Sequence, residues 1–250
     1  KGCSKIIIGI GGSATNDGGV GMAAALGVRF LQEDNSEIDL TGEGLGSLAT
    51  IDTSNLNSKI SDCQFIVACD VDNPLYGANG AAYVFAPQKG ADAEMVKILD
   101  ENLKHYAGIV NRDLGINLQK YKGSGAAGGL GAGLVAFVDA QLKSGINILL
   151  DAVDFDVLVA DADLIITGEG KIDGQSLRGK VPVGIADRAV KYHKPVIAIV
   201  GAIGDETDAL YERGISSIFS INQRPEAFEI AKNYSEENLL KTTESRSEER

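Results

Sequence analysis

The sequence predicts an α/β protein built around parallel sheets, and three observations carry this prediction. Short apolar runs rich in β-branched residues recur along the chain, at 5–10, 164–168, 196–200 and 216–221. Helical stretches separate the later runs, and strands that alternate with helices form parallel sheets with helices on both faces. Glycine is abundant, with 31 residues, and it gathers where a strand gives way to a helix.

The N-terminal segment predicts a strand, a glycine loop and a helix, which is half of a βαβ unit. The run KIIIGI is followed by GGSATNDGG and then by VGMAAALG. A glycine-rich backbone turns at positive φ and aims several N–H groups at one anion. Similar loops occur at 123–133 and 166–180, so the three loops together suggest a polyphosphate or a carboxylate as ligand.

The remaining elements predict two domains, a doubly wound, Rossmann-like parallel-sheet domain with a second, mixed α/β domain inserted into it. The expected strands and helices of the inserted part are strands at 28–31, 65–70, 81–87 and 146–153 and helices at about 92–113 and 129–142. Further helices are expected near 182–192 and 205–213. The resulting domains are 1–26 plus 161–240 for the parallel sheet, 27–160 for the insertion, and 241–250 as a charged, frayed tail. Ligands would bind in the cleft where the loops converge.

Composition and charge narrow the classes of partner. The net charge of −12 argues against a nucleic-acid surface, because binding to a phosphate backbone needs clustered Lys and Arg. No apolar run approaches the roughly 20 residues that cross a bilayer, and no signal peptide opens the chain, so we expect a cytoplasmic protein. The three cysteines form no CxxC pair and the two histidines lie far apart, which argues against a disulfide framework and a zinc site.

Two of the glycine loops imitate known phosphate-binding motifs. Residues 9–14 (GIGGSA) fit the dinucleotide pattern GxGxx[G/A], with Glu33 and Asp34 about twenty positions further on. Residues 174–180 (GQSLRGK) fit GxxxxGK, but Val181 stands where a P-loop needs Ser or Thr. The alternative is that these glycines only permit tight turns and close packing of helix on strand.

Carboxylates accompany each loop, which suits phosphoryl transfer. They are Asp17, Asp70, Asp72, Glu169 and Asp173. Magnesium prefers carboxylate oxygens, and an attacking hydroxyl benefits from an aspartate base. The alternative makes Asp17 and Asp173 helix or turn caps, where Asp is common. The cations beside the loops, which would offset these acidic surroundings, are Lys89, Lys171, Arg178 and Lys180.

Taken in order, the loops resemble the type-1 glycerate kinases of bacteria. The blocks that carry the resemblance run from residue 5 to about 221: IIIGIGGSATNDGGVGMAAALG, ACDVDNPLYGANGAAYVFAPQKGA, GAAGGLGAGL, ADLIITGEGKIDGQSLRGKVPVGIA and KPVIAIVGAIG. The resemblance implies a kinase that uses ATP and Mg²⁺ to phosphorylate D-glycerate, usually at the 2-hydroxyl and otherwise at the 3-hydroxyl, in glyoxylate or sugar-acid breakdown. It also implies two α/β domains, one inserted into the other, with the site between them.

Under this kinase interpretation the candidate residues take hypothetical roles. The residues expected to hold the nucleotide phosphates or the glycerate carboxylate are Gly11, Gly12, Ser13, Thr15, Asn16, Asp17, Gly125, Gly128, Gly129 and Arg178. Asp70 or Asp173 would be the base or a magnesium ligand, and Glu169 would hold the metal. Asn73 would orient the substrate, and Lys180 would neutralise developing charge.

Departures from the family leave alternatives open. Family members begin with loops that resemble PDSFKGS and MADGGEGT, and neither occurs here, so we expect part of a longer kinase with little or no activity of its own. The rival interpretations are a NAD-dependent Rossmann oxidoreductase, motivated by residues 9–14, and a non-catalytic fragment. Glycerate and ATP are the expected small-molecule partners, and a homodimer is one alternative for the assembly.

Overall fold

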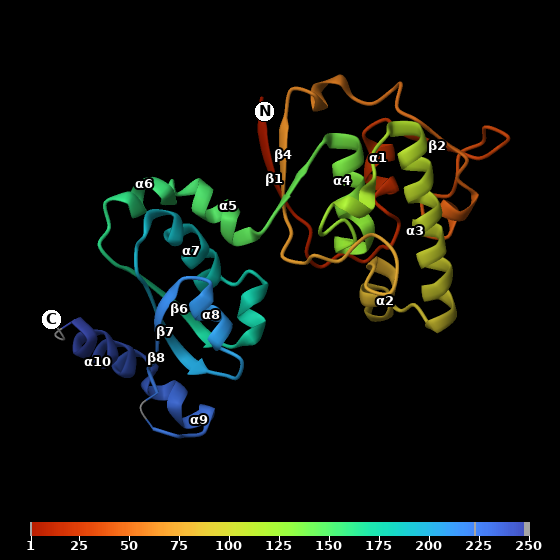
Figure 1. Ribbon diagram of the computed structural model, residues 1–250. Helices are drawn as coiled ribbons and strands as arrows, with labels where there is room; N and C mark the ends of the chain where they lie inside the picture. Colours follow the sequence, from red (N-terminus) through yellow and green to blue (C-terminus); the bar gives the residue numbers. More distant parts are fainter. Residues whose placement is uncertain (1, 223, 248–250) are drawn as a thin grey trace. The chain divides into compact units, whose positions relative to one another are not determined.

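Parallel strands form the centre of each of two units into which the chain divides (Figure 1). The computed structural model describes residues 2–222 and 224–247. Unit 1 is Lys1–Gly145 and unit 2 is Ile146–Arg250. The elements of unit 1 are β1 (Lys5–Gly9), α1 (Val20–Ala25), β2 (Arg29–Leu31), η1 (Gly44–Ser47), β3 (Thr50–Asp52), η2 (Ser58–Ile60), β4 (Gln64–Ala68), α2 (Ala81–Phe85), η3 (Pro87–Lys89), α3 (Ala93–Leu114), η4 (Leu118–Lys120), η5 (Ala126–Gly129), α4 (Leu130–Val138) and β5 (Gln141–Lys143), where η marks a 3₁₀ helix.

The main sheet of unit 1 has the order β1-β4-β5, and its pairings are parallel. The register places Ile7 opposite Ile66 and Gly9 opposite Ala68, so β1 and β4 end at the same edge of the sheet. A separate antiparallel pair joins β2 to β3. Because the loops that follow β1 and β4 leave from one edge, residues 10–13 and 69–71 are brought side by side.

The long helix α3 anchors the core of unit 1. Asp92 caps its first turn by accepting hydrogen bonds from the backbone N–H groups of Glu94 and Met95, and Gly115 ends it in the left-handed region at φ 73°. Its apolar face, which includes Leu103 and Tyr106, is fully buried. The helix thus supplies a rigid wall behind the glycine loops.

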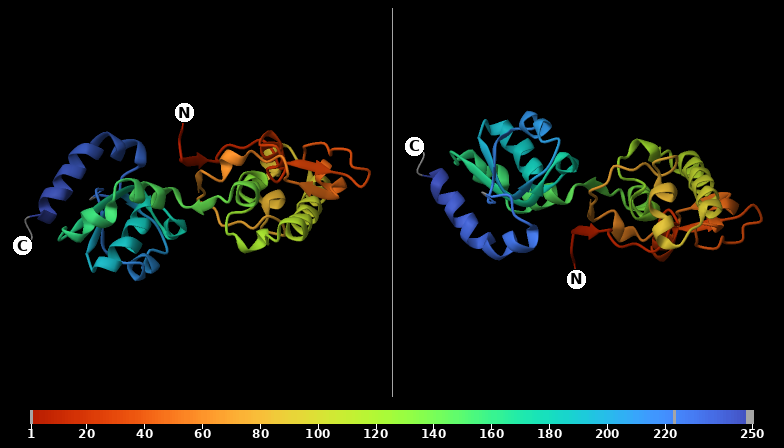
Figure 2. Two further views of the ribbon diagram at one scale, coloured as in Figure 1. Left: turned by 90° about the horizontal axis from the view of Figure 1, so that it is seen from above. Right: turned by 90° about the horizontal axis from the view of Figure 1, so that it is seen from below.

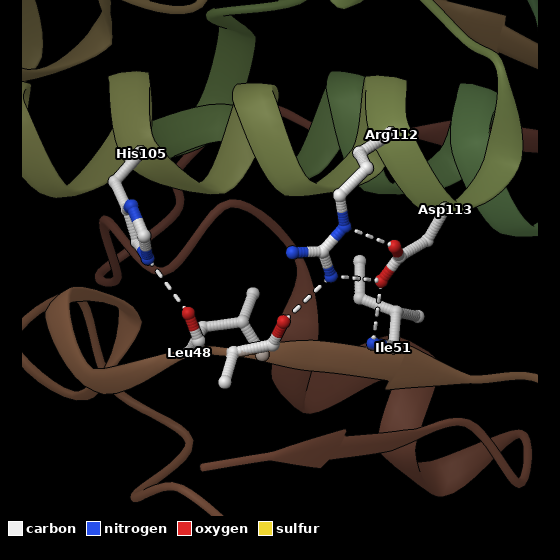
Figure 3. Close-up of polar contacts among 6 residues, drawn as sticks. Leu48, Ile51, His105, Arg112 and Asp113 are labelled. Carbon is white, nitrogen blue, oxygen red and sulfur yellow. Dashed lines mark hydrogen bonds and ion pairs between the residues drawn. The ribbon is translucent and has the colours of Figure 1, made fainter. Parts of the chain in front are cut away.

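A polar network ties the last turns of α3 to β3 and the segment before it (Figure 3). The guanidinium of Arg112 binds the carboxylate of Asp113, with Nε to Oδ1 at 2.6 Å, and also donates to the backbone oxygen of Ala49. Asp113 Oδ2 in turn accepts from the backbone N–H of Ile51 at 3.0 Å. The ring of His105 lies 2.7 Å from the backbone oxygen of Leu48, so this histidine has a structural partner.

Unit 2 is built on a parallel sheet with the order β6-β7-β8. Its elements are α5 (Gly145–Ala152), α6 (Phe155–Ala160), β6 (Ile165–Ile172), η6 (Gly174–Arg178), α7 (Val181–Ala189), η7 (Val190–Tyr192), β7 (Val196–Ile203), α8 (Asp208–Glu212), β8 (Ile215–Ser220), α9 (Phe228–Ala231), η8 (Lys232–Tyr234) and α10 (Ser235–Ser247). One face of the sheet packs on α7 and α8 through a core that includes Ala198, Val200 and Val183. Figure 2 shows α9 and α10, in dark blue, on the other side of this sheet from α8.

The division of the chain differs from the one expected from the sequence. Residues 1–26 were expected to share a sheet with 161–240, but β1 pairs with β4 inside unit 1, and β6 pairs with β7 inside unit 2. The insertion expected at 27–160 is therefore grouped with the N-terminal residues as far as Gly145. The physical reason is that apolar β-branched runs predict strands without saying which runs are neighbours.

Two segments expected as strands are helices. Residues 81–87 contain α2, because Ala81, Ala82 and Ala86 fall on one side of a helix and are buried, whereas Tyr83 and Val84 are exposed. Residues 146–153 lie largely in α5. A short apolar run fits a helix as well as a strand, and periodicity alone cannot separate them.

Two further element boundaries differ from those expected from the sequence. The helix expected at 129–142 ends at Val138, and Asp139 in the left-handed region leads into β5. The tail expected to be frayed from 241 continues helix α10 to Ser247, with an ion pair between Glu237 and Lys241 one turn apart. Residues 248–250 lie outside the described part of the chain.

Among the helices that the structure describes, none combines the length and the apolar character that a membrane span requires.

Candidate active site

A cavity of about 350 Å³ lies at the edge of unit 1 where β1 and β4 end. Its lining is Ile10, Gly11, Gly12, Ser13, Ala68, Cys69, Asp70, Val71, Phe85, Gln88, Lys89, Ala126 and Ala127. Ligands of parallel α/β sheets bind at this carboxyl edge, because the loops that follow the strands meet there. The predicted residues Gly11, Gly12, Ser13 and Asp70 are brought together here.

Lys89 is the cation of this cavity. It lies at the end of η3, before Gly90, whose φ of 100° ends the turn. The ammonium donates to Ser13 Oγ at 2.8 Å and to the backbone oxygen of Thr15. Burial lowers the pKa of Lys89, and the negative charge of Asp17 partly opposes this shift. A half-buried ammonium held against a glycine loop is a ready partner for an anionic ligand.

The first glycine loop, residues 10–19, is stiffened by Asp17. This carboxylate is buried and accepts from the backbone N–H groups of Gly19 and Gly21 at the start of α1, so it acts as a cap. Thr15 donates its hydroxyl to the same carboxylate at 3.3 Å. The amide of Asn16 has both polar atoms buried without a partner among the described residues. Asp17 therefore holds the later part of the loop, whereas Gly11, Gly12 and Ser13 line the cavity.

The second glycine loop packs against the first. The N–H of Gly125 donates to the backbone oxygen of Asn73 at 3.0 Å, and the N–H of Gly18 donates to the backbone oxygen of Gly128 at 3.0 Å. A Cβ at Gly128 would lie 2.1 Å from the oxygen of Thr15, which no side chain tolerates. The structure thus gives Gly125 and Gly128 a packing role, and Gly129, whose Cβ would fall 2.7 Å from the Cα of Gly18, shares it.

Asp70 and Asn73 follow β4 and differ in their surroundings. Asp70 lines the cavity, and its Oδ1 accepts from the N–H of Gly145 at 2.7 Å. The structure records no partner for Oδ2 among the described residues. The Asn73 side chain donates to the backbone oxygen of Asn79 at 2.8 Å and so holds its own loop. Of the two, only Asp70 borders the cavity.

The predicted residues of the third loop lie in unit 2. Asp173 caps η6 by accepting from the N–H of Gln175 at 3.1 Å, and it pairs with Lys171 Nζ at 3.1 Å. The hydrogen bond from Lys171 lowers the pKa of Asp173, so its carboxylate stays ionised. Glu169 lies earlier on β6, and Lys180 Nζ is 3.5 Å from the backbone oxygen of Lys171. The cap expected as the alternative role of Asp173 is thus present.

Arg178 and the metal site are the remaining parts of the predicted site. The side chain of Arg178 lies outside the part that the structure describes. Within the described residues, His, Cys, Asp and Glu form no group of three or more that would hold a metal ion by itself. A magnesium site that substrate phosphates complete needs only one or two protein carboxylates.

The two imitated motifs lack the geometry that their functions require. A dinucleotide fingerprint opens a helix directly after its strand, but residues 10–19 separate β1 from α1. Its acidic partner should end a second strand of the same unit, whereas Asp34 lies in the turn between β2 and β3 and accepts from Ser36. The P-loop match fails because η6 coils through residues 174–178. The geometry therefore disfavours the oxidoreductase interpretation.

Sequence reasoning left Lys89 and Cys69 without a role in the site. Lys89 was only one of several cations beside the loops, and it is 76 residues from Ser13 in sequence. Cys69 Sγ lies 3.3 Å from the backbone oxygen of Val71, and burial raises the pKa of its thiol. Cys69 is therefore a neutral wall of the cavity rather than a nucleophile.

Comparison with known proteins agrees with the resemblance found in the sequence. The model of the glycerate kinase family matches residues 1–248. A glycerate kinase of Bacillus cereus is 49% identical over 245 residues, which cover 98% of this chain and 64% of that protein. A glycerate 2-kinase of Escherichia coli is 50% identical over 88% of this chain and 58% of its own length.

A comparison with solved structures supports the same family. A crystal structure assigned to glycerate kinase 2 of Salmonella typhimurium LT2 matches with a TM-score of 0.75 and 48% identity, over 94% of this chain and 61% of that one. The chain therefore spans about three fifths of the length of these relatives. On these matches, the chain belongs to the glycerate kinase family.

Proposed function

We propose that the protein containing this chain transfers the γ-phosphoryl group of ATP to the 2-hydroxyl of D-glycerate, giving 2-phosphoglycerate and ADP. Family membership supports the reaction class. The choice of the 2-hydroxyl follows the similar E. coli protein, which is described as a glycerate 2-kinase. The observation that carries the proposal is the cavity in unit 1, where Lys89 and Asp70 stand beside the same glycine loop.

The cavity offers complementary groups for a small hydroxy acid. Lys89 binds the carboxylate of glycerate, together with the loop of Gly11, Gly12 and Ser13. Glycine at 11 and 12 leaves the ligand side open, since a Cβ at either position would meet no atom within 4 Å. The acid is therefore held by charge at one end, which leaves its hydroxyl groups to face the acidic side of the cavity.

Asp70 is the base of the proposed reaction. Its Oδ1 is fixed by the N–H of Gly145, and Oδ2 receives the proton of the attacking hydroxyl. The hydroxyl oxygen forms a bond to the γ-phosphorus while the bond from that phosphorus to the bridging oxygen of ADP breaks. Positioning and charge supply most of the rate in such transfers, and Lys89 contributes to both.

The family implies ATP as the phosphoryl donor, and Mg²⁺ is proposed with it. Because Oδ2 of Asp70 serves as the base, the carboxylates proposed to hold the metal are those of Glu169 and Asp173, and phosphate and water would complete its ligands. When bound, the metal would neutralise charge on the β- and γ-phosphates. Glu169 and Asp173 remain proposed ligands, and the coupled assay described next tests their part in this reaction.

The experiment is a coupled assay of the complete protein with ATP, Mg²⁺ and D-glycerate, with the product identified by ³¹P NMR. The 2-phosphate is expected, and the 3-phosphate would refute the proposed position of transfer. Asp70→Asn keeps an oxygen that can accept from Gly145, so the loop should stay in place. Loss of the base should lower kcat by at least about 100-fold with a small change in KM for glycerate. Unchanged kcat would remove Asp70 from the mechanism.

A further inference from the structure

A chain of polar contacts leads from the buried Asp17 to the cation of the unit 1 cavity. Asp17 Oδ1 accepts from the hydroxyl of Thr15 at 3.3 Å, and the backbone oxygen of Thr15 accepts from Lys89 Nζ. Asp17 is only 8% exposed and does not line the cavity, whereas Lys89 does. Thr15 therefore connects a buried carboxylate to the ammonium at the cavity wall.

The ammonium of Lys89 has one donor left for a ligand. Of its three N–H groups, one donates to Ser13 Oγ at 2.8 Å and another to the backbone oxygen of Thr15. The structure records no acceptor for the third among the described residues. Since the three donors diverge from one nitrogen, the two bonds to the loop fix the direction of the third. Lys89 and Ser13 both line the cavity, so the third N–H is available to an anion there.

The charges around Lys89 give Asp17 a second effect on it. The titratable groups around Lys89 are Asp17, in the loop after β1, and Asp70 and Cys69, which line the same cavity after β4. Burial raises the pKa of the Cys69 thiol and that of Tyr106, which packs against the loop from α3, so both stay neutral. Burial lowers the pKa of Lys89, and the charge of Asp17 opposes this shift. The carboxylate of Asp17 thus favours the protonated ammonium.

Capping alone does not account for this arrangement. A cap needs an oxygen that accepts from the backbone N–H groups of Gly19 and Gly21, and asparagine supplies one as well as aspartate does. The bond to the Thr15 hydroxyl and the charge that acts on Lys89 lie outside that role.

We propose that Asp17 is a positioning residue for Lys89: it fixes Thr15, and Thr15 together with Ser13 aims the ammonium at the carboxylate of the substrate. The proposal rests on the proposed function for the identity of that substrate. Asp17 then acts on glycerate binding through Lys89, without touching the substrate itself.

The first test is steady-state kinetics of the complete protein with ATP, Mg²⁺ and D-glycerate. Thr15→Val removes the hydroxyl but keeps the β-branched shape, the backbone oxygen and the cap at Asp17. A net hydrogen bond corresponds to roughly 2- to 10-fold, so KM for glycerate should rise by that factor, with a smaller change in kcat. Thr15→Ser restores the hydroxyl and should bring KM within about twofold of the wild-type value. Thr50→Val, at an exposed position of β3, is the matched control and should leave KM unchanged.

Asp17→Asn separates the charge from the cap. Asparagine keeps an oxygen for Gly19 and Thr15 but loses the bond to Gly21, so Tm is measured alongside. KM for glycerate should rise at least about fivefold at neutral pH. In the Lys89→Met background the same substitution should change KM by less than about twofold, because no ammonium is left to position. Additive effects of the two substitutions on KM, or a lower Tm with unchanged KM, would overturn the proposal.

A second measurement does not need the reaction. Acetylation of the Lys89 amine by acetic anhydride, followed by mass spectrometry across a pH series, reports the pKa of this group in the 250-residue chain. Only the neutral amine reacts, and Asp17→Asn removes the charge that opposes the effect of burial, so the midpoint should move to lower pH, while Thr50→Val should not move it. An unmoved midpoint in Asp17→Asn would refute the positioning role. A shifted midpoint in a complete protein that does not phosphorylate glycerate would instead refute only the proposed function.

Discussion

Replacing Lys89 with methionine tests the anion site most directly. Methionine keeps the length of the side chain and its contact with the cavity wall but removes the ammonium that binds Ser13 Oγ at 2.8 Å. A hydrogen bond to a charged group contributes about 1.5–3 kcal/mol, and a half-buried cation belongs in the upper half of that range. Two to three kcal/mol corresponds to about 30- to 150-fold in affinity for the bound carboxylate. We therefore expect KM for glycerate to rise by that factor, with a smaller change in kcat.

The assay compares steady-state kinetics of the complete protein with those of Lys89→Met and Lys97→Met. Lys97 is exposed on α3, so its substitution should leave KM unchanged. The pH dependence gives an independent check, because burial lowers the pKa of Lys89. Affinity for glycerate should fall as the pH rises through that lowered pKa, earlier than an ordinary lysine would allow, and the methionine variant should lack this decline. A KM within about threefold of the wild-type value would refute the assignment of Lys89 to the carboxylate.

Three further predictions concern other parts of the chain. Asp173→Asn keeps a good capping residue, so thermal stability should hold, while turnover in the coupled assay should fall at least about tenfold; near-normal turnover would leave Asp173 as a cap only. Gly125→Ala places a Cβ 2.1 Å from a backbone oxygen and should lower the free energy of unfolding in urea by at least about 2 kcal/mol, whereas Gly108→Ala should raise it by up to about 1 kcal/mol. Since Arg112 lowers the folded-state pKa of Asp113, the stability from this carboxylate is present above its unfolded pKa and is lost as the pH falls through the folded value. Acid titration of Asp113→Asn should show a shallower loss below about pH 4, and an identical slope would contradict this.

The strands at the start of the chain and in the sheet of unit 2 were predictable from the sequence. β1, β6, β7 and β8 follow from β-branched runs whose composition suits a buried parallel sheet, and the helix expected at about 92–113 corresponds to α3. The pairing of β1 with β4 was not predictable, since it depends on contacts between segments about sixty residues apart. α2 was missed because its alanines reveal their buried side only when α3 is in place.

The candidate site was predicted in part. Gly11, Gly12, Ser13 and Asp70 were named from the loops that contain them, and they meet because both loops leave the same sheet edge. Lys89 could not be singled out, because nothing in its local sequence distinguishes it from Lys171 or Lys180. Some glycines line the cavity and others pack against backbone. The difference likewise depends on contacts with segments that are distant in sequence.

The contact between the two glycine loops bears on how variants of this protein are interpreted. Gly128 and Gly129 tolerate no side chain, since a Cβ at either would strike the backbone of residues 15–18. A saturation-mutagenesis screen scored by growth on glycerate would therefore rank them beside Asp70, although they do not line the cavity that Asp70 borders. Abundance measured in the same library would separate the two groups, because loss at Gly128 and Gly129 should follow the amount of folded protein. A map of intolerant positions alone would overstate the extent of the catalytic surface.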